Sequence, residues 1–174
     1  MAPELTDGVV VLATMTVADA AALVAGEDHD IVTRLSWGPS TLASAQRHIN
    51  AAASDWRADW YRPGAKLAWG IRDAATNTLA GTAQVQLRNP ELDAGAANLA
   101  YGVFPAWRGR RYGARAVELM CDFLVEQTTA TVAVLRIDRD NAPSRRVAQD
   151  SGFRPSPELA PARASMLWFA RTLP

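Results

Sequence analysis

The sequence predicts a single α/β domain that spans residues 1–174, with a mixed, mostly antiparallel central sheet flanked by helices. Two observations predict it. Strand-like runs come first, and the second half of the chain reads strand, helix, strand, helix, strand. A chain of 174 residues with no recognisable linker fits one domain and buries about two thirds of the surface of its unfolded state. We therefore expect one hydrophobic core around one sheet.

The first half of the chain is predicted to contain three strands and two helices. A polar break at residues 26–30 follows the first helix. A second break, at Gly38-Pro39-Ser40, precedes the other helix, which Ser40 or Thr41 caps. Two strand-like runs are joined by the short turn Ala-Ala-Thr-Asn and therefore form a hairpin. The expected elements are a strand at 9–12, an alanine-rich helix at 16–26, a helix ending at Trp60, and hairpin strands at 66–73 and 78–87.

The second half alternates strands with helices. A strand at 98–104 ends before Pro105, and a helix at 111–126 follows because apolar side chains recur there at helical spacing. A β-branched strand at 131–137 precedes a short helix that Asn141 caps and Gly152 ends. A closing strand covers 165–173. The apolar residues that place one face of the longer helix on the sheet are Ala114, Val117, Met120, Cys121, Leu124 and Val125.

The run at 103–113 has the composition of an anion-binding turn. A strand ends, a turn containing Gly109 follows, and a helix begins. The free N–H groups of a helix's first turn and the helix macrodipole attract negative charge, and glycine lets a ligand approach the backbone closely. Arg108, Arg110 and Arg111 add charged donors suited to phosphate.

This run resembles the coenzyme A pyrophosphate loop of the Gcn5-related N-acetyltransferases, whose motif is Arg/Gln-x-x-Gly-x-Gly/Ala after a strand that ends in Val-x-Pro. Arg108 matches the first position and Gly113 the last. Arg111 stands where the family has its middle glycine, and arginine resists backbone angles that glycine adopts. The resemblance implies acetyl-coenzyme A as cosubstrate, bound by Val103, Arg108, Gly109, Arg110, Arg111, Tyr112, Gly113, Ala114, Asn141 and Ser144.

A second segment, at 141–153, supports the same resemblance. It reads Asn-Ala-Pro-Ser-Arg-Arg-Val-Ala-Gln-Asp-Ser-Gly-Phe. This is similar to the motif Asn-x-x-Ser-x-x-x-Ala-x-x-x-Gly-Phe of the ribosomal-protein N-acetyltransferase-like branch of the family. On local chemistry alone the segment is a short helix with Asn141 as its N-cap. One helix and one strand separate the two motifs, as in the family, and together they predict the GNAT fold.

The resemblance also implies catalytic roles. The family transfers an acetyl group directly from acetyl-coenzyme A to an amine through a tetrahedral intermediate. Its oxyanion donor is a backbone N–H near the end of the strand before the loop, here Val103, and such a donor contributes about 3 kcal/mol. Ser144 matches the serine proposed to protonate the departing thiolate; its other interpretation is a helix-surface serine bonded to its own backbone. Ala148 excludes a tyrosine acid where other branches carry one.

The sequence does not identify a general base. Many relatives have a glutamate on the strand before the loop, and Asn98 occupies that position. An amide cannot accept the ammonium proton. Either water and strand carbonyls carry the proton away, Asp138 or Glu91 accepts it, or the acceptor has a low pKa. Asn98 remains a candidate for substrate binding, and its other interpretation is an exposed strand residue.

Aromatic residues in the N-terminal half are further candidates for substrate binding. Trp37, Trp56 and Trp60 fall where the family builds its acceptor pocket or dimer contacts. Aromatic side chains also suit a core or an interface. The acceptor stays open between a protein N-terminus, a small amine and an antibiotic.

Composition limits the partners. Eighteen basic residues balance eighteen acidic ones at a pI of about 6.7, so we expect no nucleic-acid or membrane partner. The single cysteine, Cys121, excludes an internal disulfide, and His29 and His48 lack metal-ligand spacing, so we expect no metal. Acidic residues near the start and the lack of a long apolar run favour the cytoplasm. A homodimer is compatible with this composition.

The sequence therefore predicts an acetyl-coenzyme A-dependent N-acetyltransferase that acts on a primary amine. The missing glutamate at Asn98 keeps a second hypothesis open, a non-catalytic sensor module that binds acyl-coenzyme A. The chain has no Gly-x-x-x-x-Gly-Lys-Ser/Thr loop and no Gly-x-Gly-x-x-Gly after a strand. P-loop and Rossmann proteins are disfavoured because their phosphate loops are missing.

Overall fold

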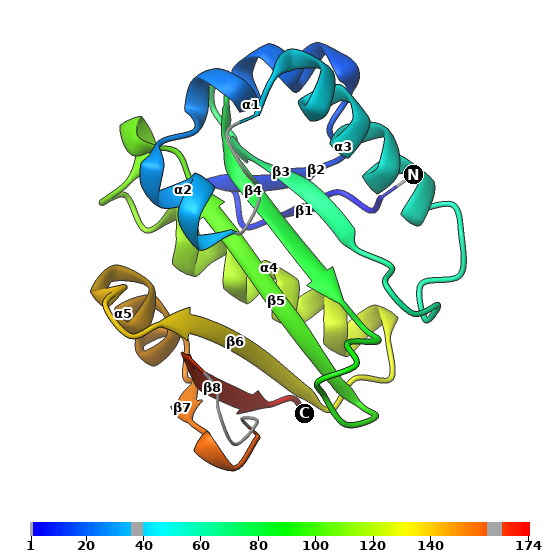
Figure 1. Cartoon of the computed structure of the whole chain (residues 1–174), viewed down its shortest axis with the longest axis vertical. Helices are drawn as coiled ribbons and strands as arrows, with labels where there is room; N and C mark the ends of the chain where they lie inside the picture. The colour runs from blue at the N-terminus through cyan, green and yellow to red at the C-terminus, as the bar shows by residue number, and fades with distance from the viewer. Residues whose placement is uncertain (1, 36–39, 160–164) are drawn as a thin grey trace.

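The computed structural model describes residues 2–35, 40–159 and 165–174, which form a central sheet with helices on both faces (Figure 1). Neighbouring strands in the described sheet are antiparallel except β5 and β6, which are parallel. The predicted mixed, mostly antiparallel sheet is confirmed. In order across the sheet the strands are β1 (Leu5–Thr6), β2 (Val10–Ala13), β3 (Leu67–Asp73), β4 (Leu79–Gln86), β5 (Ala96–Val103), β6 (Val132–Asp138), β8 (Met166–Thr172) and β7 (Arg154–Pro155).

Helices cover both faces of the sheet. The long helix α4 lies behind the sheet in Figure 1 and packs on β2, β4 and β5, and α5 packs beside it. The N-terminal helices lie on the opposite face, where they share a second apolar cluster with Phe104. The helices are α1 (Ala20–Gly26), α2 (His29–Arg34), α3 (Leu42–Asp55), α4 (Tyr112–Gln127) and α5 (Ala142–Asp150), with 3-10 turns at Val17–Asp19, Pro105–Trp107 and Pro157–Leu159.

The helix expected to reach Trp60 ends at Asp55, so its predicted end is wrong. The Asp55 carboxylate accepts a hydrogen bond from the Lys66 N–H at 2.9 Å. The Trp56 indole N–H donates to the Ala68 carbonyl at 2.8 Å. Both contacts join the end of α3 to the start of β3. The chain turns back toward the sheet there, which is why the helix cannot continue.

Three short elements were not predicted. Helix α2 occupies part of the predicted polar break, with Asp28 as an N-cap that accepts a hydrogen bond from the Ile31 N–H at 3.0 Å. A helix of six residues is too short to display a helical apolar period. Strands β1 and β7 contain two residues each, which is also too short for a periodic signal. Gly38 and Pro39 of the second predicted break lie outside the described residues.

Trp56 is a core residue. Its side chain is 4% exposed and packs edge-on against Trp69 and Phe123, with ring centroids 4.6 and 5.9 Å away. Trp60 is half-buried and packs edge-on against Trp56 at 5.4 Å. These rings join the end of α3 to β3 and to the middle of α4. The cluster therefore fixes the end of α3 to the sheet and to α4.

The sheet divides between β5 and β6. The two strands pair over residues 96–99 and 132–135. Beyond that point β5 stays paired with β4 as far as Val103, and β6 stays paired with β8 as far as Asp138, but β5 and β6 no longer pair with each other. Figure 1 shows the two strands close at one end and spread apart at the other, where α5 lies. The backbone groups that face this opening have no ladder partner.

Replacing Trp56 with alanine is expected to lower the free energy of unfolding by about 3–5 kcal/mol, the usual cost of deleting a core tryptophan. Trp56→Phe keeps most of the ring contact and loses the hydrogen bond to Ala68, so the expected loss is smaller, about 1–2 kcal/mol. Urea unfolding followed by circular dichroism measures both changes. Unfolding of Trp56→Ala at the urea concentration of the wild type would contradict the core assignment.

Candidate active site

The start of α4 has no cap. Arg111 occupies the N-cap position without a capping hydrogen bond, and the first helical bond joins the Arg115 N–H to the Arg111 carbonyl at 3.0 Å. Within the described residues, the N–H groups of 109–114 have no protein acceptor. Free N–H groups at the positive end of a helix attract an anion. The turn therefore has the electrostatics predicted for a phosphate-binding loop.

Arg111 has a left-handed backbone conformation, with φ of 63°. Arginine at this position adopts a conformation that usually requires glycine, at a cost of roughly 1–2 kcal/mol. Gly109, two residues earlier, also has a positive φ, of 75°. Residues 109 and 111 are both exposed, so the backbone path of the loop, and not the packing of a side chain, sets the strain at Arg111.

Gly113 lies in the first turn of α4 and faces Tyr101 of β5. A Cβ atom at position 113 would lie 2.8 Å from the Tyr101 ring. Only glycine leaves room for the ring between helix and strand. Gly113 therefore has a packing role in addition to its predicted contact with the cofactor.

The Arg108 guanidinium is already committed to protein partners. Its two terminal nitrogens donate to the Asp28 carboxylate at 2.7 and 3.0 Å, and its Nε donates to the Val103 carbonyl at 3.0 Å. The hydrogen-bonded guanidinium holds the pKa of Asp28 below its usual range. The predicted contact of the Arg108 side chain with phosphate remains a prediction. In this structure the side chain ties the N-cap of α2 to the end of β5.

Arg110 and Tyr112 have different surroundings. The Arg110 guanidinium lies 5.1 Å from the centre of the Trp107 ring, which stacks on the Tyr112 ring at 5.3 Å. Tyr112 is buried, and its hydroxyl donates to Asp73. The Tyr112 side chain is therefore part of the packing beneath the loop, and only its backbone N–H faces the predicted anion site. Arg108, Arg110 and Arg111 are all exposed, but among the described residues Arg110 and Arg111 have no salt-bridge partner.

The Val103 backbone N–H points toward the division of the sheet. The next residue, Phe104, donates its N–H to the Ala80 carbonyl of β4 at 2.8 Å. Successive residues of a paired strand direct their N–H groups to opposite sides, so those of Val103 and Tyr101 point away from β4. The Val103 N–H therefore faces the opening. The Val103 carbonyl accepts a hydrogen bond from Arg108 Nε. The orientation of the N–H is the one that an oxyanion donor needs.

Helix α5 brings Ser144 to the open end of the division. The Asn141 side chain accepts a hydrogen bond from the Ser144 N–H at 3.1 Å, so the predicted N-cap is confirmed. The predicted contact of Asn141 with the cofactor remains a prediction. Ala148 is buried one turn later and leaves Ser144 as the hydroxyl that α5 offers at these two positions.

Tyr101 is a polar residue at the opening that the sequence analysis did not nominate. Burial raises the pKa of Tyr101 to about 12, and an interaction with the Ser144 side chain lowers it against that effect. The Tyr101 hydroxyl has no hydrogen-bond partner among the described residues. The sequence carried no signal for it, because a tyrosine within a strand-like run is equally typical of a packed side chain.

Asn98 lies where β5 and β6 separate. It is 5% exposed, and its Oδ1 accepts a hydrogen bond from Arg136 Nε at 3.0 Å. Arg136 also pairs with Glu91 and lies over the Trp168 ring. The alternative that Asn98 is an exposed strand residue is therefore wrong. Its predicted contact with substrate remains a prediction.

Both acids considered as alternative bases are paired with arginines. Asp138 pairs with Arg34 at 3.2 Å, and Glu91 pairs with Arg136. Arg34 also pairs with Asp140 at 2.8 Å, so α2 is tied to the end of β6. Asp138 and Glu91 therefore each have a guanidinium partner in this arrangement.

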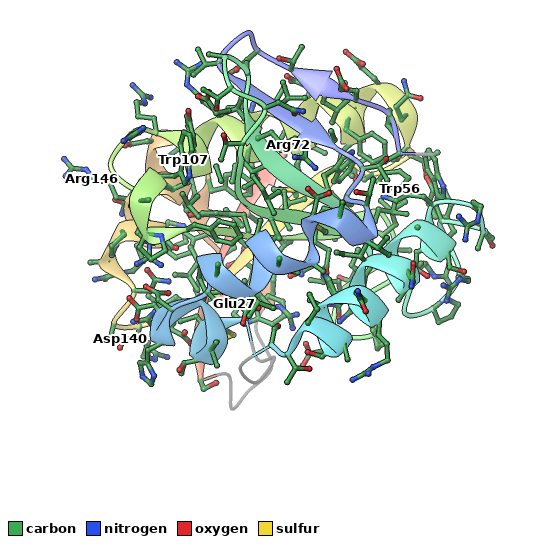
Figure 2. All side chains as sticks on the ribbon, turned by 90° about the horizontal axis from the view of Figure 1, so that it is seen from above. Glu27, Trp56, Arg72, Trp107, Asp140 and Arg146 are labelled. Atoms are coloured by element: carbon green, nitrogen blue, oxygen red, sulfur yellow. The ribbon has the colours of Figure 1, made fainter. Side chains whose placement is uncertain are left out.

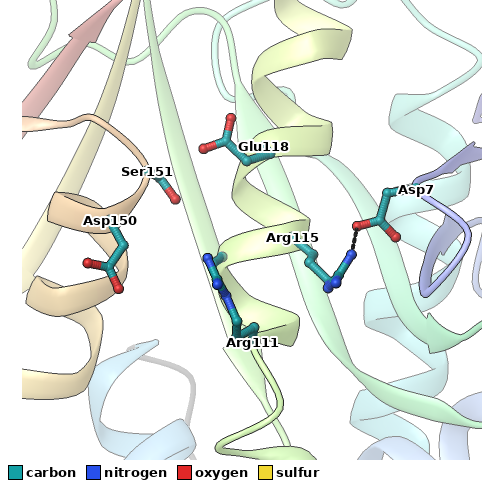
Figure 3. A pocket seen from close by; sticks show the side chains of 7 residues that line it. Asp7, Arg111, Arg115, Glu118, Asp150 and Ser151 are labelled. Carbon is teal, nitrogen blue, oxygen red and sulfur yellow. Dashed lines mark hydrogen bonds and ion pairs between the residues drawn. The ribbon is translucent and has the colours of Figure 1, made fainter.

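A surface pocket of about 310 Å³ adjoins the first turns of α4. Figure 3 shows Arg111 and Arg115 on α4 between Asp150 on one side and Asp7 on the other. Arg115 pairs with Asp7 at 2.6 Å, whereas Arg111 has no salt-bridge partner among the described residues. The pocket lining therefore combines the two arginines with three acids, Asp7, Glu118 and Asp150.

The tryptophans proposed to bind the acceptor lie elsewhere. Figure 2 shows Trp56 on the opposite side of the molecule from Trp107, which belongs to the turn before the loop. Because the Trp56 ring is buried in the core, the structure contradicts a role for it in an acceptor pocket. Among the described residues, the Trp60 ring packs against the rings of Trp56 and Phe123. Trp37 lies outside the described residues.

Three further findings concern cofactors and membranes. In the described parts of the chain, no helix is long and apolar enough to cross a membrane. The same parts contain no group of three or more histidine, cysteine, aspartate or glutamate side chains placed to hold a metal ion. Burial raises the pKa of the Cys121 thiol to about 12. This thiol is therefore protonated at neutral pH and is not an activated nucleophile.

Comparison with known proteins identifies a family. The model of the acetyltransferase (GNAT) domain matches residues 10–154. A search of curated proteins gives no significant match. Among solved structures, the chain is similar to an acetyltransferase from Agrobacterium tumefaciens, with 22% identity, a TM-score of 0.76 and coverage of 98% of this chain and 95% of that one.

Two similar structures contain the coenzyme. The RimL ribosomal-protein alpha-N-acetyltransferase, solved with coenzyme A, has 14% identity, a TM-score of 0.77 and coverage of 98% of both chains. A microcin self-immunity acetyltransferase, solved with acetyl-coenzyme A and AMP, has 13% identity, a TM-score of 0.76 and coverage of 97% of this chain and 94% of that one. At these identities the likeness shows the shared fold.

Arg111→Gly is expected to raise the melting temperature by about 2–4 °C, because relief of the left-handed arginine contributes roughly 1 kcal/mol in a domain of this size. Differential scanning calorimetry measures the change. Asn77→Gly is the matched control, since Asn77 has φ of 57° and asparagine tolerates this conformation better. A melting temperature for Arg111→Gly at or below that of the wild type would show that the arginine is not strained.

Proposed function

The chain belongs to the acetyltransferase (GNAT) domain family and is an N-acetyltransferase, and we propose that it transfers an acetyl group from acetyl-coenzyme A directly to a primary amine. The single observation that carries the proposed cofactor site is the uncapped start of α4 beside the division of β5 and β6. A phosphate site and an opening lined by unpaired backbone groups together match a ligand with a pyrophosphate and an extended amide-containing arm.

We assign the pyrophosphate to the N–H groups of 109–114. Arg110 and Arg111 add positive charge at the same turn, and neither needs to leave a salt bridge. The pantetheine arm enters the opening between β5 and β6, where its amides replace the missing ladder partners. The adenosine end then lies toward the pocket beside Arg115.

The acetyl carbonyl is polarised by the Val103 N–H, which faces the opening. As the amine attacks, negative charge develops on the carbonyl oxygen, and a preorganised donor stabilises it more than the ground state. The carbon–sulfur bond then breaks, and the electron pair passes to sulfur. Ser144 supplies a proton to the departing thiolate, while the amine nitrogen releases one as it becomes an amide.

The acceptor is proposed to be a protein N-terminus or a small-molecule amine, since neither Asn98 nor the paired acids favour a strongly basic amine. Water and strand carbonyls carry the released proton. The amide of Asn98, in place of a carboxylate base, favours the second candidate function, a non-catalytic module that senses acyl-coenzyme A. We also propose the cytoplasm as the compartment and homodimerisation as compatible with the fold. No nucleic-acid partner is proposed, because the overall charge is balanced.

A substrate screen separates the two candidate functions. Acetyl-coenzyme A is mixed with N-terminal peptides, polyamines and aminoglycosides, and thiol release is followed with a chromogenic reagent. Calorimetry with acetyl-coenzyme A runs in parallel. Amine-dependent thiol release supports the enzyme, whereas tight binding with no release for any amine supports the sensor.

Gly109→Pro is expected to weaken coenzyme A binding by about tenfold or more, because proline fixes φ near −65° and cannot keep the loop conformation. Gly64→Pro is the matched control: Gly64 has φ of 81°, and a Cβ there meets no atom within 4 Å, as at Gly109. Calorimetric titration measures the affinity of both variants. Equal affinity for Gly109→Pro and Gly64→Pro would overturn the pyrophosphate assignment.

Ser144→Ala is expected to lower kcat by about 10²-fold or more, the usual contribution of general acid assistance, while acetyl-coenzyme A binding changes little. The helix should stay intact because Asn141, its N-cap, accepts from the backbone N–H of residue 144. Steady-state kinetics and calorimetry are measured on the same preparation. Parallel losses of only a few-fold in kcat and in binding would assign Ser144 to cofactor positioning instead.

A further inference from the structure

Arg136 of β6 is the centre of a polar group beside the opening between β5 and β6. Its Nε donates to Asn98 Oδ1 at 3.0 Å, and its Nη1 pairs with Glu91. The guanidinium also lies 5.6 Å from the centre of the ring of Trp168, the residue directly opposite Arg136 on β8. Strand β5, strand β8 and the connection between β4 and β5 therefore all hold one guanidinium.

This group lies on the face of the sheet opposite α4, the face turned toward the viewer in Figure 1. Successive side chains of a strand point to opposite faces. Leu99 and Leu135 belong to the core cluster beneath α4, so their neighbours Asn98 and Arg136 point the other way. Asn98 is in the last paired stretch of β5 and β6, and Arg136 lies just past it. The group is therefore placed on the acceptor side of the opening, away from α4.

Two donors of the group have no partner among the described residues. One is Asn98 Nδ2, because the oxygen of that amide already accepts from Arg136. The other is Arg136 Nη2. Within the described residues, the fully buried polar atoms that lack a hydrogen bond belong to Tyr101 and Arg145. Asn98 Nδ2 and Arg136 Nη2 therefore reach solvent, where they can bind oxygen atoms of a ligand.

Glu91 is the partner of Arg136 that is displaced most easily. Its side chain is 51% exposed, against 25% for that of Arg136, whereas Asn98 and Trp168 are buried. An ion pair with such an exposed member is weak. Once Glu91 leaves, Nη1 and Nη2 form the planar fork of donors that binds both oxygens of a carboxylate. Glu91 therefore occupies the place that a ligand carboxylate would take.

We propose that Arg136 binds a carboxylate of the acceptor in place of Glu91, and that the acceptor is a peptide N-terminus followed by an acidic side chain. The inference rests on the proposed function, because the acceptor amine must reach the acetyl group beside the Val103 N–H. Asn98 lies five residues before Val103 on β5, roughly 16 Å along the strand.

The length of this path sets the position of the acidic residue. An extended peptide whose amine lies beside Val103 advances roughly 3.5 Å per residue. Its own acidic side chain and that of Arg136 cover part of the distance. The carboxylate therefore belongs to the third, fourth or fifth residue of the peptide, and a free amino acid is too short. A polyamine or an aminoglycoside would bring a second cation to Arg136, which repulsion between like charges disfavours.

A peptide series tests the carboxylate site. Hexapeptides that begin with serine carry one glutamate, moved from the second to the sixth residue, and each has a counterpart with glutamine. We expect KM to be about tenfold lower for glutamate than for glutamine at the third to fifth residues. Equal KM values for glutamate and glutamine peptides would overturn the site. A preference of the same size at every position would also overturn it, since general attraction explains that result.

Arg136→Gln should abolish the preference for glutamate and change KM for the glutamine peptides little. Arg88→Gln is the matched control, because Arg88 is an exposed arginine of the same connection as Glu91 and has no salt-bridge partner among the described residues. Equal loss of the preference in both variants would overturn the site. So would an equal loss of activity on both kinds of peptide with a lower melting temperature, because Arg136 would then be structural.

Glu91→Gln tests whether Glu91 competes with the acceptor. We expect KM for the preferred glutamate peptide to fall about threefold, because the peptide no longer has to displace a carboxylate from Arg136. The glutamine counterpart should gain nothing. An unchanged or higher KM for the glutamate peptide would show that Glu91 does not occupy the ligand's place.

A binding measurement without turnover separates this inference from the proposed function. Calorimetry follows the preferred glutamate peptide as it binds to the protein saturated with coenzyme A, in the wild type and in Arg136→Gln. Binding that requires Arg136, with no acetylation of any peptide, would sink the transferase and keep the carboxylate site. Acetylation and binding that do not depend on Arg136 would sink the carboxylate site and keep the transferase.

Discussion

The parting of β5 from β6 is the constraint on which the rest of the structure depends. Each strand keeps a full antiparallel partner on its outer side, β4 for one and β8 for the other, past the point of separation. The two arms of the sheet are therefore satisfied independently. The opening between them is set by strand pairing and does not need a ligand to hold it. Residues at its rim can then be placed by the elements that follow each strand.

Helix α2 connects the two arms across the open end. Arg108 joins Asp28, the N-cap of α2, to the end of β5. Arg34, the last residue of α2, pairs with Asp138 at the end of β6 and with Asp140 just after it. Partly exposed ion pairs contribute little to stability, typically less than about 1 kcal/mol each. Their effect here is on geometry. They fix how far a six-residue helix lies from each arm, and so limit the width of the opening.

The parts that depend on local sequence were predictable, and the parts that depend on distant partners were not. The long helix, the loop before it and the Asn141 cap have their signals within a few residues, and the structure contains all three. The partner of Arg108 lies 80 residues away along the chain, so nothing near Arg108 indicated that its charge was already used. The predicted acceptor-binding role of Trp56 was wrong for the same reason, because the burial of Trp56 depends on rings from β3 and α4.

The polar residues around the opening are suited to one of the two proton transfers of the proposed acetyl transfer more than to the other. On the side proposed for the leaving sulfur, Ser144 lies in the first turn of α5. On the side of Asn98, the nearby Glu91 is paired with Arg136, and an amide accepts no proton. Such a site assists departure of the thiolate more than removal of a proton from an ammonium. If the proposed function holds, we expect an amine that is already partly neutral, such as a protein α-amino group with a pKa of about 7.7–8.0, to be a better acceptor than a lysine side chain at about 10.4.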